Sequence, residues 1–414
     1  MSIRKRTWKT AKGEAKEAWV ADYVDQAGKR RLKTFKRKKD ADAFHSKANV
    51  EVSEGVHTAD SASTTIGNAA DLWLETCRAN GLEAATIDAY EQHVRLHLKP
   101  FLGRLKLSQL TAPMVRDFED KLRRGDAAPG EAEGNARSPA MVRRIITSLS
   151  TMVGDAQERG LVARNVVKDL RSRRKRGKEK QHESRHNGKL KIGADIPSPE
   201  EVKAVLAALD GRWRPILLTA TFTGLRASEL RGLKWADVDL DKRELHVRQR
   251  ADKRNVIGPP KSAAGERTIP LPPIVVSALL AHKLASKDRK GLVFGTGAGK
   301  PEYHSNIVNR GLIPAWIAAA VTVPVLDEDG KPAKDEEGRA IVAAKYTGLH
   351  ALRHFYASWL INRKADGGLE LPAKTVQERL GHSTIAMTLD TYSHLFPAAD
   401  AHEELVAAER ALLG

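Results

Sequence analysis

Six side chains in the C-terminal half of the chain are of the types that phosphoryl transfer to a tyrosine requires. They are two arginines, a lysine, two histidines and a tyrosine: Arg226, Lys261, His350, Arg353, His382 and Tyr392. Arginine guanidinium groups can fork onto the nonbridging oxygens of a phosphodiester and offset the charge that grows in the transition state. Tyrosine has an ordinary pKa of about 10, so a nucleophilic Tyr392 needs a nearby proton acceptor or a strong positive field, which His350 could help to supply. The departing 5′ oxygen must be protonated, and Lys261 is the natural acid.

The local sequence predicts that three of these residues lie at helix junctions or in a loop. Gly224 ends one predicted helix, so Arg226 lies beside the free backbone N–H groups of the next. His382 follows a second glycine that ends a helix, and Lys261 lies in the loop GPPKSAAGER. Each feature alone is ordinary for a surface residue. The inference therefore depends on the set as a whole.

The segment 349–360 predicts a helix in which His350 and Arg353 share one exposed edge and could hold an anion. Its expected buried stripe consists of Leu349, Leu352, Tyr356, Trp359 and Leu360. His350 and His354, at positions i and i+4, could instead bind zinc, but the glutamate of an HExxH motif does not lie between them. Because the set of six candidate residues includes no paired carboxylates and no metal cluster, we expect no metal site.

These residues stand in five short motifs that follow one another in the order TGLRASEL, PPKSAAGERTIPL, HALRH, LGH and DTYSH. Together the motifs resemble the tyrosine recombinase, or phage integrase, family, across the whole catalytic half and without a departure at any catalytic position. The resemblance implies that Tyr392 cleaves one DNA strand, leaving a 3′ phosphotyrosine and a free 5′ hydroxyl. It also implies that His382 donates a hydrogen bond to the phosphate and that Glu229 holds the basic residues in place. Bond energy is conserved in such a reaction, so no cofactor is expected.

The resemblance further implies a site-specific recombinase that integrates and excises a mobile element. Four protomers on two DNA sites would exchange strands pairwise through a Holliday junction. The expected partners are therefore double-stranded DNA, with core and arm attachment sites, and a homotetramer formed on it. A directionality factor (excisionase) and a DNA-bending host protein are further candidate partners. The amphipathic segment 398–413 would dock on a neighbouring protomer.

Two other functions fit part of the same pattern. A type IB topoisomerase uses closely similar residues but relaxes supercoils, and the basic N-terminal segment favours recombination over that activity. A DNA-binding regulator with a retired active site is the second alternative, and the intact set of six residues argues against it.

Composition and charge agree with a DNA-binding protein. The chain has 414 residues, which predicts two or three domains. Its 70 Lys and Arg against 52 Asp and Glu give a net charge of +18, so a polyanionic partner is expected, although a basic solvated surface is the alternative. Membrane-spanning and signal-peptide patterns are missing, and the single cysteine, Cys77, excludes a disulfide framework. These patterns predict a cytosolic or nucleic-acid-bound protein, and with the resemblance we expect it in the bacterial cytoplasm, bound to DNA at the nucleoid.

The pattern along the chain predicts a multidomain protein. Residues 1–60 are expected to form a small basic β-rich domain, and 64–170 an all-α helical bundle. The resemblance implies that the first binds arm-type DNA and that the second is SAM-like and binds core DNA. Residues 171–195 read as a basic interdomain linker, and 196–414 as a mixed α+β catalytic domain with a tail helix.

Two basic clusters are candidates for gripping the DNA backbone. The first places eight positive charges in and after a predicted hairpin strand: Lys29, Arg30, Arg31, Lys33, Lys36, Arg37, Lys38 and Lys39. The second lies in the linker: Arg173, Arg174, Lys175 and Arg176. A flexible basic tether without ordered DNA contacts is an equally good interpretation of the linker.

Three further elements are predicted from local patterns. An amphipathic helix from Thr86 is expected to end at Pro100. Residues 244–250 and 267–271 should pair as strands, and 321–346, with apolar ends around an acidic, Gly-containing middle, should form a surface hairpin.

Overall fold

The computed structural model describes residues 2–9, 15–25, 28–53, 55, 59, 63–129, 134–174, 189–327, 329–397 and 401–413. The chain divides into two compact units, Met1–Glu183 and Ser184–Gly414. Among the described helices, none has the length and apolar character needed to cross a membrane.

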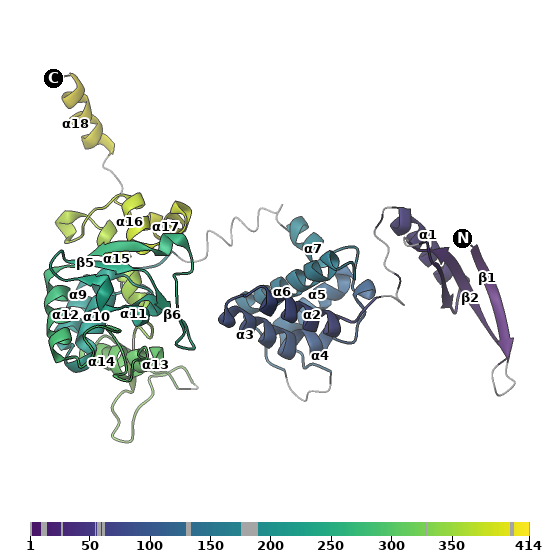
Figure 1. Cartoon of the computed structure of the whole chain (residues 1–414), viewed down its shortest axis with the longest axis horizontal. Coiled ribbons are helices and arrows are strands. Elements are labelled where there is room, and N and C mark those ends of the chain that lie inside the picture. The colour runs from purple at the N-terminus through teal and green to yellow at the C-terminus, as the bar shows by residue number, and fades with distance from the viewer. Residues whose placement is uncertain are drawn as a thin grey trace. The chain divides into compact units, whose positions relative to one another are not determined.

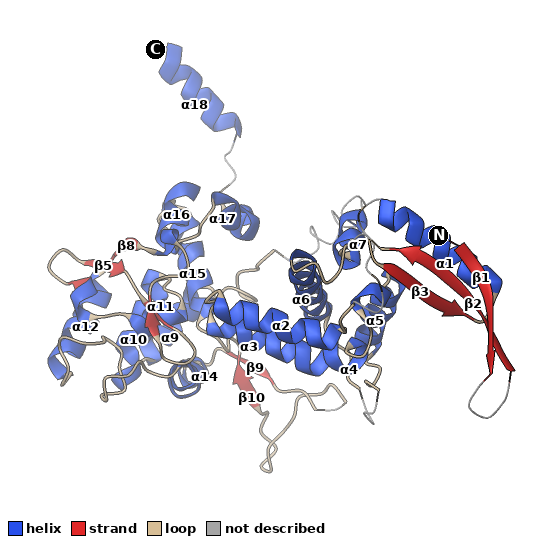
Figure 2. Ribbon diagram, turned by 45° about the vertical axis from the view of Figure 1, so that its right-hand side comes forward, coloured by secondary structure: helices blue, strands red, loops and turns tan. Residues whose placement is uncertain are grey.

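The N-terminal part is a three-stranded antiparallel sheet with one helix, shown as red strands beside α1 in Figure 2. Its elements are β1 (Ser2–Lys9), β2 (Ala15–Val24), β3 (Arg30–Phe35) and α1 (Lys38–Ser53). The predicted hairpin is β2 with β3, and Phe44 of α1 packs against Tyr23 and Phe35 of the sheet. The sequence did not predict β1, because SIRKRTWK is too basic to show an apolar alternation.

A helical bundle follows in the same unit. Its helices are α2 (Ile66–Ala79), α3 (Ala84–His93), α4 (Lys99–Leu102), α5 (Ala112–Arg124), α6 (Pro139–Glu158) and α7 (Val166–Arg174). Ser138 caps α6 by accepting a hydrogen bond from the Met141 N–H, and the apolar stripe of α6 is buried in the bundle core.

Pro100 does not end a helix, contrary to the prediction. The turn Val94–Leu98 is a π-helix that joins α3 to α4, and the Lys99 N–H donates to the Val94 carbonyl, five residues back. A proline ring normally collides with the carbonyl four residues before it. The widened π-turn makes room for the ring, so the helix continues through Pro100 to Leu102.

The predicted linker also begins too early. Residues 171–174 form the end of α7, while 175–188 lie outside the described residues. The first described residues of the second unit form a short turn, in which Ile192 and Ile196 make an isolated β-bridge.

The second unit mixes helices with small sheets. Its helices are α9 (Pro199–Ala208), α10 (Arg214–Thr223), α11 (Ala227–Gly232), α12 (Pro273–Ala285), α13 (His304–Asn306), α14 (Ile313–Ala318), α15 (His350–Ile361), α16 (Ala373–Leu380), α17 (Ile385–Tyr392) and α18 (Ala401–Leu413). Its strands are β4 (Val238–Asp239), β5 (Glu244–Val247), β6 (Arg250–Ala251), β7 (Ile257–Gly258), β8 (Arg267–Pro270), β9 (Thr322–Pro324) and β10 (Val342–Ala344). The sheets are antiparallel: β4-β5-β8, β6-β7 and β9-β10.

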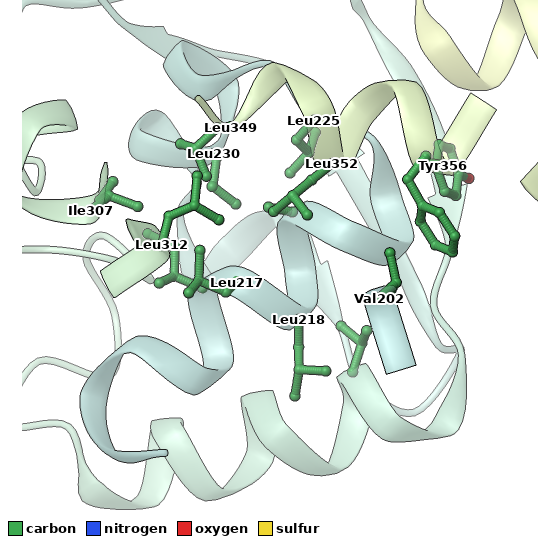
Figure 3. Close-up of a cluster of buried hydrophobic side chains, with 14 of the residues drawn as sticks. Val202, Leu217, Leu218, Leu225, Leu230, Ile307, Leu312, Leu349, Leu352 and Tyr356 are labelled. Carbon is green, nitrogen blue, oxygen red and sulfur yellow. The ribbon is translucent and has the colours of Figure 1, made fainter. Parts of the chain in front are cut away.

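Helix α10 lies at the centre of this unit and packs against α12 and α15 (Figure 1). Leu217, Leu225 and Leu352 are buried in one apolar cluster (Figure 3). The core therefore fixes α15 relative to the turn that follows α10, and this turn carries Arg226.

The predicted pairing of 244–250 with 267–271 is confirmed as β5 with β8, where Leu245 faces Ile269. The predicted hairpin of 321–346 is also confirmed by the antiparallel register of β9 and β10. The middle of this hairpin contains two tight turns. The side chain of Asp327 accepts two backbone N–H bonds in the first turn, and the side chain of Asp335 accepts two in the second.

We expect Gly224→Ala to destabilise the second unit strongly. Gly224 has φ of +58°, and a Cβ there would overlap the buried ring of Tyr356. Left-handed strain costs about 1–2 kcal/mol, and overpacking adds about 1–3 kcal/mol. Hydrogen exchange of the α10 and α15 amides in urea measures the loss in the free energy of unfolding.

Gly211→Ala is the matched control for this prediction. Gly211 has a similar φ of +59°, but nothing lies within 4 Å of its Cβ position. The loss of stability in Gly211→Ala should therefore reflect the backbone strain alone. Equal losses in the two variants would contradict the role assigned to the Tyr356 contact.

Candidate active site

Three arginines converge on the C-terminal end of α16. Arg267 Nε donates to the Arg379 carbonyl at 2.8 Å, Arg353 Nη2 to the Leu380 carbonyl at 2.6 Å, and Arg226 Nη2 to the Gly381 carbonyl at 2.9 Å. The last carbonyls of a helix have no intrahelical partner and carry its negative dipole end, so guanidinium groups are well suited to them. The three contacts join β8, α15 and the α10–α11 turn to one helix end.

Glu229 holds two of these arginines from the other side. Its carboxylate accepts from Arg226 Nη1 at 2.7 Å and from Arg267 Nη2 at 2.9 Å, and it also accepts from the Arg226 backbone N–H at 3.0 Å. Burial raises the pKa of Glu229, but Arg267 and Arg226 outweigh it and keep the pKa below 4.5. The carboxylate therefore remains ionised at neutral pH.

Arg353 is buried, contrary to the expectation that it shares an exposed edge with His350. Its exposed fraction is 2%, and its guanidinium donates to the carbonyls of Gly224 and Leu380. Burial, together with Arg226 and Arg267, lowers its pKa to about 10, so it stays protonated at neutral pH. Helical periodicity suggested exposure because it could not anticipate that α10 and α16 provide carbonyl acceptors inside the core.

Tyr392, at the end of α17, is buried within this cluster. Its hydroxyl lies 2.7 Å from Nδ1 of His354, a residue considered in the sequence only as a zinc ligand. Burial raises the pKa of Tyr392 to about 12, although the positive charge of Arg353 acts in the opposite direction. His350, expected to help Tyr392, instead lies edge-on to the His354 ring, with centroids 4.5 Å apart.

His382 lies beside Tyr392, as the loop after Gly381 allows. Its ring is parallel to that of Tyr392 within 4°, with centroids 6.5 Å apart, and its Nδ1 lies 2.9 Å from Thr388 Oγ1. Burial, together with Arg353 and other nearby cations, lowers the pKa of His382 to about 4. It is therefore neutral at pH 7 and retains one ring N–H.

Lys261 is exposed on the loop that follows β7. The hairpin before it is anchored by Arg231, a buried residue that donates to the Asp252 carbonyl at 3.0 Å and to the Asn255 side chain. Pro260 packs closely against Gly265 at the far end of the loop. The loop is thus fixed at both ends while Lys261 remains accessible.

Sequence reasoning missed Arg267 and His354 as site residues. In the sequence Arg267 was considered only as the first residue of a predicted strand. The alternation along β8, which places Arg267 on the same face as the buried Ile269, was the one signal that could have indicated an inward side chain. His354 was considered only as the second member of the i, i+4 pair with His350, a possible zinc site. Among the described residues, no group of side chains has the composition of a metal site, so the zinc interpretation gains no support.

The first basic cluster is partly engaged within its own domain. Arg30 pairs with the buried Asp22, Arg31 with Asp25, and Arg37 with Asp40. Two lysines lie over aromatic rings: Lys33 over Phe44 and Lys38 over Trp19. Lys29, Lys36 and Lys39 are exposed.

The second basic cluster falls largely beyond the described part of the chain. Arg173 and Arg174 belong to the last turn of α7, and Lys175 and Arg176 lie outside the described residues.

Comparison with known proteins matches both units. Residues 65–123 match the family model for the phage integrase N-terminal SAM-like domain, and 198–308 match that of the phage integrase family. A tyrosine recombinase XerC-like protein of Caldanaerobacter subterraneus is 27% identical over 402 residues, which cover 90% of each chain. The integrase of Mycobacterium phage L5 is 24% identical, covering 98% of this chain and 97% of the phage protein.

Solved structures give the same fold. The Tn1549 transposon integrase in complex with transposon right end DNA has a TM-score of 0.57 at 18% identity, covering 84% of this chain and all of that one (100%). A lambda integrase tetramer bound to a Holliday junction has a TM-score of 0.50 at 16% identity, covering 91% of this chain and 95% of that one. The multidomain architecture is therefore that of known integrase structures.

We expect Glu229→Gln to cost about 3–5 kcal/mol at pH 7, because it leaves the buried guanidinium of Arg267 and the partly exposed one of Arg226 without their counter-charge. The folded-state pKa of Glu229 lies below 4.5, so the ionised carboxylate stabilises the fold above pH 4.5. That contribution is lost as the pH falls through the folded-state pKa. Urea unfolding of wild type and Glu229→Gln at pH 7 and below pH 4.5 measures this effect. The difference between their free energies of unfolding should be smaller at the acidic pH.

Glu266→Gln is the control for the Glu229 variant. Glu266 is exposed on the loop next to Arg267, and its change should stay within about 0.5 kcal/mol. A Glu229→Gln loss no larger than this would contradict the central position of Glu229.

Proposed function

The chain belongs to the phage integrase family, and we infer that it is a site-specific tyrosine recombinase that cuts and rejoins DNA through a 3′ phosphotyrosine. One observation carries this inference most directly. Tyr392 is buried with its hydroxyl on a histidine, in the unit where three arginines converge on one helix end. That arrangement offers a nucleophile and preorganised positive charge, which phosphodiester cleavage needs.

We propose that Arg226 and Arg353 bind the scissile phosphate. The Arg226 side chain is 34% exposed and points from a helix start, so a phosphate from solvent can reach it. Arg353 is held by carbonyls beneath it and supplies positive charge beside Tyr392. Because Glu229 and the helix end fix these groups before DNA arrives, little reorganisation is needed in the transition state.

The remaining roles follow from accessibility. Lys261, exposed on its anchored loop, would protonate the departing 5′ oxygen. His382, neutral and parallel to the tyrosine ring, would donate its ring N–H to a nonbridging oxygen. His350 is exposed at the start of α15, where it could contact the same phosphate.

The domains suggest a division of labour on DNA. Residues 1–60, with their basic strand, would bind arm-type sites, and the bundle of 64–170 would bind core DNA. The basic segment 175–195, which comes after α7 in the sequence, would track the backbone between the bundle and the catalytic part, 196–414. The match of 65–123 to the SAM-like family model supports the second assignment.

We propose that the protein works as a homotetramer on two DNA sites and integrates and excises a mobile element. In α18, Leu405, Val406 and Leu412 are exposed, which supports docking of this tail on a neighbouring protomer. An excisionase and a DNA-bending host protein are proposed as accessory partners. The relatives come from bacteria and a bacteriophage, which supports action on DNA in a bacterial cytoplasm.

We expect Tyr392→Phe to abolish covalent capture of DNA while leaving DNA binding intact. The phenyl ring keeps the packing of the buried side chain but has no oxygen to attack phosphorus. The measurement is a denaturant-stable adduct on nicked suicide substrates made from the ends of the element, with peptide mapping of the modified residue.

Tyr303→Phe is the control, because Tyr303 is exposed in the same unit and should leave the adduct unchanged. An adduct that maps to another residue, or persists in Tyr392→Phe, would refute the assignment. Relaxation of plasmids without attachment sites would point instead to a type IB topoisomerase. A variant Tyr392→Phe that keeps full biological function would point to a regulator.

We expect the double change Lys36→Ala, Lys39→Ala to weaken the salt dependence of DNA binding without slowing cleavage of bound DNA. Each phosphate contact adds about −0.9 to the slope of log K against log salt, so the slope should become less negative by up to about 1.8. The measurement is a salt titration of affinity for a random-sequence duplex.

The pair Lys331→Ala, Lys334→Ala removes the same charge from exposed positions of the 321–346 hairpin and is the control. An equal change of slope in both double variants would indicate a general effect of net charge. In that case the N-terminal strand would have no special role.

A further inference from the structure

The contact between Tyr392 and His354 is the only hydrogen bond recorded for the tyrosine hydroxyl within the described residues. It spans 2.7 Å from the hydroxyl oxygen to Nδ1 and links the end of α17 to the second turn of α15. The two rings meet at 64° with centroids 5.8 Å apart, so the imidazole presents its edge to the phenol oxygen. At this distance Nδ1, when it carries no proton, can accept a hydrogen bond from the tyrosine hydroxyl.

The groups around His354 keep it neutral. Burial, with His350 and Arg353 on the same helix, lowers the pKa of His354 to about 4, while Asp195 acts in the opposite direction. From α17, the facing group is Tyr392 itself. A neutral imidazole has one nitrogen free to accept a proton, and with Nε2 protonated that nitrogen is Nδ1.

The other histidines are less well placed for this task. His382 stacks parallel to the tyrosine ring, and its Nδ1 is taken by Thr388. His350 contacts the His354 ring and is exposed towards solvent. Among the histidines that the structure describes, only His354 has a ring nitrogen recorded within hydrogen-bonding distance of the Tyr392 oxygen, which must lose its proton.

We propose that His354 Nδ1 accepts the phenolic proton of Tyr392 as the tyrosine oxygen attacks the scissile phosphorus. This inference rests on the proposed function. The bond from Tyr392 oxygen to phosphorus forms, the bond from phosphorus to the 5′ oxygen breaks, and its electron pair leaves with that oxygen, which takes a proton from Lys261. When the 5′ hydroxyl attacks the phosphotyrosine, His354 returns its proton to the departing Tyr392 oxygen.

The arrival of DNA would favour this transfer. Without DNA, burial raises the pKa of the phenol to about 12, while burial, His350 and the cation Arg353 lower the pKa of His354, so the proton stays on Tyr392. A phosphodiester brings negative charge next to these cations, which raises the basicity of a nearby imidazole. Formation of the oxygen–phosphorus bond simultaneously makes the phenol more acidic. The nucleophile would thus be activated only on bound DNA.

The test compares His354→Asn with wild type in single-turnover cleavage of the nicked substrate. The asparagine carbonyl can keep an acceptor near the position of Nδ1 but cannot hold a proton. We expect cleavage to fall by about 10²- to 10⁴-fold with DNA affinity unchanged, and the rate of the variant to rise more steeply with pH. Replacing Tyr392 by the more acidic 3,5-difluorotyrosine should restore the variant far more than it accelerates wild type.

Lys261→Ala is the control for the opposite end of the reaction. A 5′-bridging sulfur leaves without protonation, so it should rescue Lys261→Ala but not His354→Asn. A His354→Asn rate within about tenfold of wild type would overturn the inference. If His354→Asn does not fold, the test is the cleavage rate of the protein with 3,5-difluorotyrosine at position 392 and His354 unchanged. A large acceleration in that protein would show that the phenolic proton is lost before attack, and this result would also overturn the inference. Failure of wild type to form any adduct would instead refute the proposed function.

Discussion

The catalytic unit depends on three guanidinium groups meeting the last carbonyls of α16. Arg267, Arg353 and Arg226 bind three consecutive carbonyls, and Glu229 ties the first and last of these arginines together. Like charges this close would repel one another without the buried carboxylate and the negative end of the helix. The same arrangement that stabilises the fold therefore concentrates positive charge where we propose that the scissile phosphate binds.

Much of the site was predictable because its residues stand in short motifs with helix-breaking glycines. Those glycines indicated the junctions that carry Arg226 and His382, and the pairing of β5 with β8 followed from local patterns. The burial of Arg353 and the carbonyl contact of Arg267 could not be predicted, although alternation along β8 favoured an inward Arg267. Both depend on carbonyl acceptors from α16, which lies far from either residue in the sequence, and periodicity describes only one element at a time.

The same limit applies to the histidine that contacts Tyr392 and to the charge available for DNA. His350 and His354 are both on α15, and only the packing of α17 decides which one meets Tyr392. In the N-terminal domain, a count of basic residues overstated the freely available charge, because Asp22, Asp25 and Asp40 neutralise three arginines. Even the continuation of a helix through Pro100 depended on a π-turn that residue propensities do not reveal.

The crowding at Gly381 has a consequence for how this protein can evolve. A Cβ at Gly381 would come within 2.8 Å of Arg267 Nη1 and 2.9 Å of the Ala264 carbonyl, on the loop that follows Lys261. The effect of any substitution at 381 therefore depends on the length of the side chain at 267 and on the path of that loop. Mutations at these positions will be epistatic, so adaptation of the active site must pass through paired changes in segments more than a hundred residues apart.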